Sequence, residues 1–275
     1  MRLPALVVTP HSSAQVPAEV LALMLGQRFY DREAREERLE WLFRESDPYT
    51  DVLFHTPEAH NLHAPVSRFV VDLNRGREEG GDNGVLKLTD FEKRLLYPAG
   101  FILSELDREE RLRRYWDSFH HEIEQVLEVN EIRLLVNGHS MQPSGPAIGP
   151  DVGKPRPAVG LMAGTDSEGT PFEGYPSLPK ALALDVLSLA HKHFAPLLRG
   201  QISEAIRLGE PWKSDQLSQR YSNPARARPV PGFGLEFNRA LYLTYEDGKE
   251  CPDDAMIRVL NAAFRAFLAE VMELV

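Results

Sequence analysis

Two patterns of apolar and polar residues alternate along the chain. Short β-branched and leucine runs that end in turn-forming residues are typical of strands, and apolar residues that recur every three or four positions are typical of helices. The expected strands cover residues 3–9, 66–75, 132–136 and 158–162 and the β-rich stretch 232–245. The expected helices start at Pro17, cover 32–44, open at the capping-box pattern 89–92, cover 104–129, 178–194 and 196–208, and end with a helix capped by Asp253. Helices that separate strands predict an α/β fold: a single domain over residues 1–275, with a mixed, mainly parallel β-sheet sandwiched by helices.

Two of the expected strands are each followed by a His-Ser pair. His11 follows the first strand, and His139 follows the strand 132–136. Functional groups collect at the carboxyl ends of strands in open α/β sheets, so both histidines are candidate ligands or acid/base groups. Hydrolytic metal sites combine imidazoles with a carboxylate, and the nearby turn-rich segment offers either Asp47 or Asp51. The alternative for each histidine is a loop residue whose ring is satisfied by the backbone.

Charge and composition narrow the class of protein. The chain has 275 residues, and its 43% hydrophobic and 26% charged residues are ordinary for a globular protein. The formal net charge of −10 argues against a nucleic-acid or anionic-membrane partner, because both attract basic surfaces. Cys251 is the only cysteine, which excludes an intrachain disulfide. No apolar window approaches the roughly 18 residues of a membrane span, and the apolar start is too short for a signal peptide, so we expect a cytoplasmic protein with no membrane partner.

Further polar groups lie within the expected strands. Arginine holds a carboxylate through two hydrogen bonds and asparagine adds a donor, so Arg68 and the pair Asn74-Arg75 suit recognition of an acidic substrate. The alternative is a solvated strand end with surface salt bridges.

Glu236 faces away from its two apolar neighbours on a period-two pattern. If that face lines a pocket, burial raises the pKa of Glu236 and suits it for general acid/base chemistry; if the face meets water, Glu236 is a surface carboxylate.

Six motifs, taken in order, resemble those of the N-formylglutamate amidohydrolase family: PHSSAQVP, SRFVVDLNR, RYWDSFH, VNGHSM, GLMAGTDSEG and GLEFNR. The resemblance extends from about residue 6 to residue 245. That family is similar to the zinc carboxypeptidases and aspartoacylases, whose fold is a mixed sheet sandwiched by helices. The resemblance implies a small-molecule N-acyl amino acid substrate, with N-formyl-L-glutamate as the leading candidate, and one bound Zn²⁺ or another divalent cation.

The resemblance also implies a role for each candidate residue. The implied metal ligands are His11, His139 and Asp47, which is preferred to Asp51. The implied catalytic residues are Glu236, as the general base, and Arg68, which either polarises the scissile carbonyl or stabilises the oxyanion. The implied substrate-binding residues, which hold carboxylates, are Asn74, Arg75 and Arg220.

Three departures and one ambiguity keep other functions open. The family's arginine before a tyrosine in the late loop appears here in Gln219-Arg220-Tyr221, shifted by one position. The family usually has Asp-Ala-His-Ser where this chain has Asn137-Gly138-His139-Ser140, so a neutral amide replaces an acid that orients a ligand. The family's Pro-His-Ser-Gly is Pro-His-Ser-Ser in this chain. His120 matches a helix histidine of the family and lies either beside the site or on the helix surface. The alternative functions are a metallo-carboxypeptidase, a different N-acyl amino acid deacylase, and a non-catalytic binding protein of the same fold.

Overall fold

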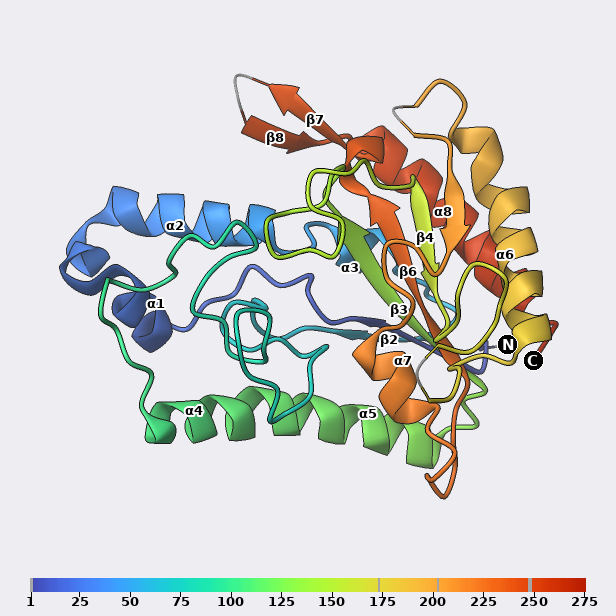
Figure 1. Ribbon diagram of the computed structural model, residues 1–275, viewed down its shortest axis with the longest axis horizontal. Helices are drawn as coiled ribbons and strands as arrows, with labels where there is room; N and C mark the ends of the chain where they lie inside the picture. Colours follow the sequence, from blue (N-terminus) through green and yellow to red (C-terminus); the bar gives the residue numbers. More distant parts are fainter. Residues whose placement is uncertain (1, 173, 202, 247–248) are drawn as a thin grey trace.

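A six-stranded mixed sheet runs through the centre of the computed structural model, which describes residues 2–172, 174–201, 203–246 and 249–275 (Figure 1). The strand order is β2-β1-β3-β6-β4-β5. The strands are β1 (Ala5–Thr9), β2 (His60–His63), β3 (Leu134–Met141), β4 (Val159–Met162), β5 (Ile206–Leu208) and β6 (Gly232–Asn238). β2, β1, β3 and β6 run parallel, whereas β4 pairs antiparallel with β6 and parallel with β5. The expected mixed, mainly parallel sheet is therefore confirmed.

Helices cover both faces of this sheet. They are α1 (Ala18–Leu25), η1 (Gly26–Tyr30), α2 (Arg32–Glu45), α3 (Thr50–Leu53), α4 (Glu105–Arg111), the π-helical turn η2 (Leu112–Asp117), α5 (Ser118–Val129), α6 (Lys180–Phe194), η3 (Ala195–Leu197), α7 (Gln216–Tyr221), η4 (Arg239–Leu241) and α8 (Asp254–Val271). One apolar core lies between the sheet and α3, α6 and α8, and a second lies on the opposite face, against α1, α2, α5 and α7. A separate hairpin is formed by β7 (Leu243–Glu246) and β8 (Lys249–Pro252). In the part of the chain that the structure describes, no helix combines the length and the apolar sequence that crossing a bilayer requires.

The two cores divide the side chains of each central strand by alternation. In β6, Phe233, Leu235 and Phe237 join the core on the α6 and α8 side. Because successive side chains of a strand point to opposite faces, Gly234 and Glu236 face the side of α5 and α7. The alternation that the sequence indicated for Glu236 is therefore confirmed.

Most of the expected helices are confirmed, and their caps explain where some begin. Asp253 accepts hydrogen bonds from the backbone N–H groups of Ala255 and Met256 and starts α8. Asp31 caps α2 in the same way. The long helical stretch before the central strand extends from Glu105 to Val129 through the π-helical turn.

Three expectations about secondary structure are wrong. Residues 66–75 form turns and coil instead of a strand: their apolar side chains enter the second core, but Ser67 and Asp72 bond to the backbone of Gln15 and Val85 rather than to a neighbouring strand. No helix begins at 89–92, because the side chain of Asp90 accepts from the backbone N–H groups of Glu92 and Arg94 and so closes a tight loop. The stretch 196–208 contains the end of η3 and the strand β5 in place of a helix.

The strand β3 is longer than expected. It continues through the Asn-Gly pair as far as Met141, since every residue from Leu135 to Met141 pairs with β6. His139 is therefore a strand residue, directly opposite Glu236 in the ladder. His11, in contrast, lies two residues beyond the end of β1. The parallel pairing of β1 with β3 brings the two histidines together.

Candidate active site

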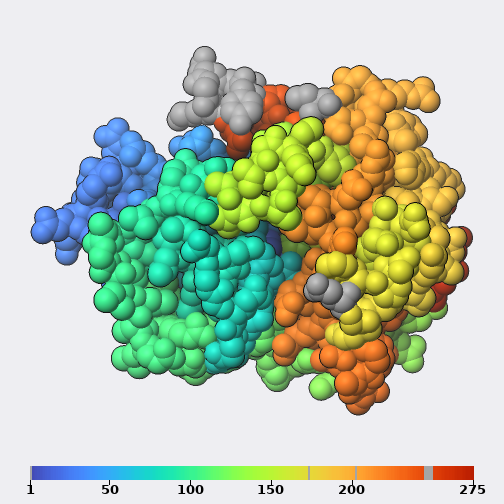
Figure 2. Space-filling model, in the orientation of Figure 1, coloured from blue at the N-terminus to red at the C-terminus, as the bar shows by residue number. Residues whose placement is uncertain are grey.

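A pocket opens on the α7 side of the sheet, beyond the carboxyl end of β1 and along β3 and β6. The segments 68–91, 139–156 and 212–215 carry many of its lining residues, and Figure 2 shows them in teal, yellow-green and orange where they meet on the surface. The charged lining residues are four arginines and three carboxylates: Arg68, Arg75, Arg156, Arg239, Asp47, Asp215 and Glu236. All of the sequence-predicted site residues except Arg220 line this pocket.

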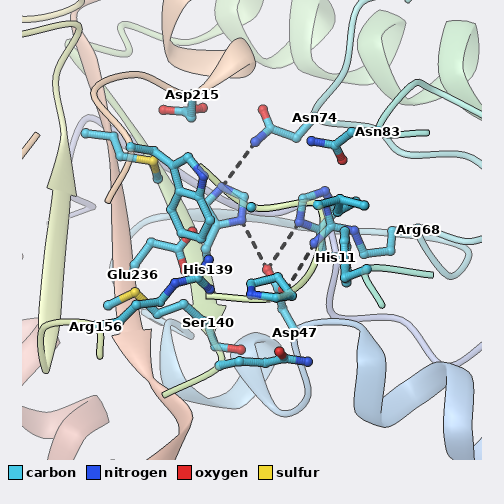
Figure 3. A pocket seen from close by; sticks show the side chains of 18 of the residues that line it. His11, Asp47, Arg68, Asn74, Asn83, His139, Ser140, Arg156, Asp215 and Glu236 are labelled. Carbon is cyan, nitrogen blue, oxygen red and sulfur yellow. Dashed lines mark hydrogen bonds and ion pairs between the residues drawn. The ribbon is translucent and has the colours of Figure 1, made fainter. Parts of the chain in front are cut away.

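His11, Asp47 and His139 form the centre of the pocket (Figure 3). Their ligand atoms all lie within 4.8 Å of one another, and all three residues are buried. The two Nδ1 atoms lie 3.1 and 3.2 Å from the same oxygen, Oδ2 of Asp47. Two imidazole nitrogens and a carboxylate oxygen are a donor set that suits zinc. Asp51, the other candidate carboxylate, is exposed and is not a member of this group.

The outer nitrogens of the two rings have different partners. Nε2 of His11 lies 2.8 Å from Oδ1 of the fully buried Asp72. As a metal ligand, the ring would donate its Nε2–H to this carboxylate and turn the lone pair of Nδ1 toward the centre of the group. Nε2 of His139 has only a long contact, 3.5 Å, with the side-chain nitrogen of Asn74. The Asn74 oxygen accepts from the backbone N–H of Leu217 at 2.9 Å, which fixes the amide in this orientation. His11 is therefore the more firmly oriented candidate ligand.

Positive charge surrounds Asp47. Nη1 of Arg68 lies 3.3 Å, and Nη2 of Arg239 3.6 Å, from Oδ1 of Asp47. Burial alone raises the pKa of this carboxyl, but the His11 charge, the hydrogen bonds of both imidazoles and the Arg68 charge outweigh it and hold the pKa of Asp47 well below its usual range. Asp47 is thus an anion that is ready to bind a cation.

Glu236 lies beside the His-Asp-His group as a buried and incompletely bonded carboxylate. Burial, reinforced by the negative charge of Asp47, raises its pKa to about 7 although the charge of His139 opposes this. Its Oε2 has no hydrogen-bond partner among the described residues. A carboxylate whose pKa is close to neutrality exchanges protons readily at physiological pH. The face of Glu236 lines the pocket, as the first of the two sequence interpretations requires.

The three predicted arginines have different environments. Arg68 is held by two hydrogen bonds to Oδ2 of Asp72 and presents its remaining nitrogen to Asp47. Arg75 lines the pocket, and its Nε and Nη1 donate to the backbone oxygens of Asn83 and Asn74. Arg220 is exposed, packs over the ring of Trp116 at 5.0 Å and does not line the pocket.

His120 and Asn137 are buried away from the three candidate ligands. His120 bonds to the Tyr221 hydroxyl at 2.8 Å and to the Leu73 carbonyl at 3.2 Å, so it is not on the helix surface. Burial, together with the charge of Arg220, lowers its pKa to about 3. The Asn137 amide donates to Asp215 at 2.8 Å and to Ser218 at 3.0 Å. The residue at the position of the family's acid therefore anchors the start of α7, where Asp215 is the N-cap.

Sequence reasoning missed several pocket and supporting residues. The carboxylate of Asp72 pairs with His11, Arg68 and the buried Lys87. Its place four residues after Arg68 in the motif SRFVVDLNR could have indicated that it supports the site. Arg239 donates to Ser140 and to the backbone of Arg44 beside Asp47. Arg156 belongs to a Pro- and Gly-rich loop, where no periodic pattern marked it.

A mixed α/β sheet with convergent ligand atoms beside a buried carboxylate is an arrangement typical of hydrolases that activate water. The family model described as N-formylglutamate amidohydrolase matches residues 3–243. Because this match covers most of the chain, the protein belongs to the N-formylglutamate amidohydrolase family, a family of hydrolases.

Solved structures share the fold. An N-formylglutamate amidohydrolase from Ralstonia eutropha JMP134 is similar with a TM-score of 0.67 and 19% identity, over 100% of this chain and 96% of the other. A gene product from Agrobacterium tumefaciens is similar with a TM-score of 0.60 and 17% identity, over 98% of this chain and 91% of the other. The comparison with curated proteins found no match.

Proposed function

We propose that this protein is a zinc-dependent amidohydrolase that cleaves the N-formyl amide of N-formyl-L-glutamate to formate and glutamate. The observation that carries the proposal is the convergence of His11, Asp47 and His139 beside Glu236, in a chain that belongs to this family. His11, Asp47 and His139 would hold the ion. A zinc ion supplies Lewis-acid chemistry there, because it acidifies water and polarises an acyl carbonyl.

The protein's own groups then move the protons and balance the charge. Glu236 takes a proton from the attacking water as the C–O bond forms at the formyl carbon. It returns that proton to the amide nitrogen as the C–N bond breaks, so one carboxylate acts first as base and then as acid. Arg68 stabilises the developing oxyanion, and its hydrogen bonds to Asp72 keep it in place without reorganisation.

Asn74 and Arg75 are proposed to bind the α-carboxylate of the substrate. Both line the pocket. Arg75 uses Nε and Nη1 on backbone oxygens, which leaves Nη2 for a ligand. A carboxylate bound there would direct the adjacent acylated nitrogen toward the His-Asp-His group, because Asn74 contacts His139. An overall acidic protein can in this way bind an acidic substrate through local arginines.

The direct test is release of formate and glutamate from N-formyl-L-glutamate by the purified protein, measured before and after chelation and after Zn²⁺ is restored. We expect activity that chelation abolishes and Zn²⁺ recovers, with about one equivalent of metal per chain. Cleavage of longer N-acyl amino acids in preference to the formyl compound would assign the protein to the deacylase alternative. Cleavage of peptides in preference to it would assign the metallo-carboxypeptidase alternative. A stable protein that binds no metal and cleaves none of these would be a non-catalytic member of the fold.

The first variant to make is His139→Ala. We expect it to lose measurable turnover and most of its bound metal while remaining folded, because the side chain faces the pocket and not the α6 and α8 core. Metal content by elemental analysis and far-UV circular dichroism measure the two properties separately. Unchanged turnover in His139→Ala would refute the proposed mechanism.

A further inference from the structure

The pocket contains an arginine that neither the proposed chemistry nor the sequence assigned. N-formyl-L-glutamate has two carboxylates, and Asn74 and Arg75 account for one of them. Arg220, expected to help hold the substrate carboxylates, does not line the pocket. Arg68 and Arg239 both contact Asp47 and are therefore engaged at the candidate metal group. Arg156 is the remaining arginine of the lining.

Arg156 is held in one orientation. Its Nε and Nη2 donate to the two carboxylate oxygens of Asp151, at 2.7 and 2.9 Å. Its guanidinium lies 4.5 Å from the centre of the Trp212 ring. A planar guanidinium that is fixed by a bidentate pair and an aromatic face loses little entropy when it binds another carboxylate. Among the described residues, its Nη1 has no hydrogen-bond partner.

Asp151 supplies the counter-charge that allows Arg156 to be buried, and it leaves Arg156 able to bind a ligand. Arg156 is only 4% exposed, and a buried cation without a counter-charge is strongly destabilising. The pair with Asp151 removes that cost; Asp151 follows the lining residue Pro150 in the chain, and 15% of its side chain is exposed. The loop that carries the pair is closed by backbone hydrogen bonds from Gly145 to Lys154 and from Gly153 to Gly145. The pair therefore belongs to a built wall of the pocket.

The position of Arg156 suits a side-chain anchor. It lies near Glu236, on the other side of the candidate metal group from Arg68 (Figure 3). Met141, Met162 and Trp212 also line the pocket and provide apolar surface for an aliphatic stem. A ligand held at Arg75 by its α-carboxylate and at the metal group by its acyl carbonyl would extend its side chain along this third wall.

We propose that Arg156 binds the side-chain carboxylate of an N-acyl dicarboxylic amino acid and thereby makes the pocket prefer an acidic side chain to its neutral amide. This inference rests on the proposed function. It predicts that Arg156 selects the side chain of the substrate, whereas Arg75 binds the α-carboxylate that all such substrates share.

The test compares N-formyl-L-glutamate with N-formyl-L-glutamine, which differs only in the side-chain carboxylate. In Arg156→Gln, we expect KM for the glutamate compound to rise about 10- to 100-fold, as for loss of a charged hydrogen bond, with KM for the glutamine compound nearly unchanged. In Arg75→Gln, both substrates should lose about equally, because both keep the α-carboxylate. Equal losses for the two substrates in Arg156→Gln, or no loss, would overturn the inference.

Arg226 offers a matched control outside the pocket. It also makes a bidentate pair, with Glu124, and lies 5.0 Å from the centre of the Tyr221 ring. Arg226→Gln should leave the ratio of the two kcat/KM values as in the wild type; a changed ratio there would show that selectivity does not depend on Arg156 specifically.

Asp151→Asn distinguishes substrate recognition by Arg156 from a structural role of the Arg156–Asp151 pair. It tests the inference if Arg156→Gln does not fold. The asparagine keeps one oxygen acceptor for Arg156 and removes only the counter-charge, so the protein should fold with lower stability. We expect retained or stronger preference for the glutamate compound, because the cation is no longer neutralised by a carboxylate. Loss of both substrates together would assign Arg156 a structural role instead. A wild-type protein that cleaves neither substrate would refute the proposed function itself, whereas cleavage of both without preference would refute only this inference.

Discussion

The two faces of the central strands β3 and β6 differ although one backbone builds both. On the α6 and α8 face, Phe237 stacks on Phe54 at 5.3 Å and meets the edge of Phe194 at 5.2 Å. On the α7 face, the neighbouring Glu236 stands opposite His139, with a carboxylate oxygen that has no hydrogen-bond partner in the described part of the chain. The side chains of the first face are fully packed against other apolar side chains. On the second face, a buried polar atom lacks a hydrogen-bond partner among the described residues.

The difference indicates where stability and function reside. Burial of apolar rings contributes favourably to folding, whereas a buried carboxylate without partners costs free energy. Proteins retain such an unfavourable group when it takes part in binding or catalysis, and strongly perturbed pKa values are found most often at functional sites. We therefore expect substitutions on the two faces to have opposite effects on stability and on turnover.

The largest effect is expected for Glu236→Gln. It should lower kcat by about 10²- to 10⁴-fold, because a positioned proton carrier is lost. The stability of the metal-free protein should be unchanged or higher, since the amide removes a carboxyl that burial disfavours as an anion. Turnover of N-formyl-L-glutamate and urea unfolding measure the two quantities.

Glu124→Gln is the control for this variant, because Glu124 pairs with Arg226 outside the pocket. It should turn over substrate like the wild type. A Glu236→Gln protein that is both active and destabilised would mean that Glu236 is a structural residue.

Phe237→Ala, one residue further along β6, should show the opposite pattern. Its ring is fully buried, and removal of such a ring costs about 3–5 kcal/mol of folding free energy. The folded fraction should keep a kcat close to that of the wild type, because the ring faces away from the pocket. Chemical denaturation and turnover corrected for the folded fraction test this. A loss of kcat comparable to that of Glu236→Gln would show that the two faces are not independent.

The sequence alone predicted the elements of this comparison that depend on local patterns. Period-two alternation placed Glu236 on the other face of its strand from its apolar neighbours. Two apolar runs that end near His-Ser pairs marked His11, which follows β1, and His139, which lies in the adjacent strand β3. Membership in the family and the mixed sheet were likewise predicted and confirmed.

The parts that failed depend on long-range contacts. Residues 66–75 have strand-like composition, yet the backbone bonds of Ser67 and Asp72 go to distant loop positions that no local pattern encodes. Arg156 acquires its orientation from Asp151 and Trp212, which lie in loops without periodicity. The Asn-Gly pair at 137–138 looked like the end of a strand, but pairing with β6 carries β3 past it.

The smallest expected effects come from two glycines that face opposite sides of these strands. A Cβ at Gly138 would lie 2.3 Å from the ring of Phe54, which is fixed between Phe237 and Phe264. A Cβ at Gly234 would lie 2.4 Å from the terminal methyl of Met162, the flexible end of a side chain that lines the pocket. Gly138→Ala should therefore cost about 1–3 kcal/mol of stability, as overpacking of a rigid core does.

Gly234→Ala should cost less stability, because the Met162 methyl can swing aside, although its Cβ also comes within 3.0 Å of an Asp215 oxygen. The displaced methyl would enter the substrate pocket, so we expect KM to rise in Gly234→Ala and to stay unchanged in Gly138→Ala. Urea unfolding and KM for N-formyl-L-glutamate, measured on both variants, give the comparison. If Gly138→Ala raised KM, and Gly234→Ala cost more stability than Gly138→Ala, the division of roles between the faces would be wrong.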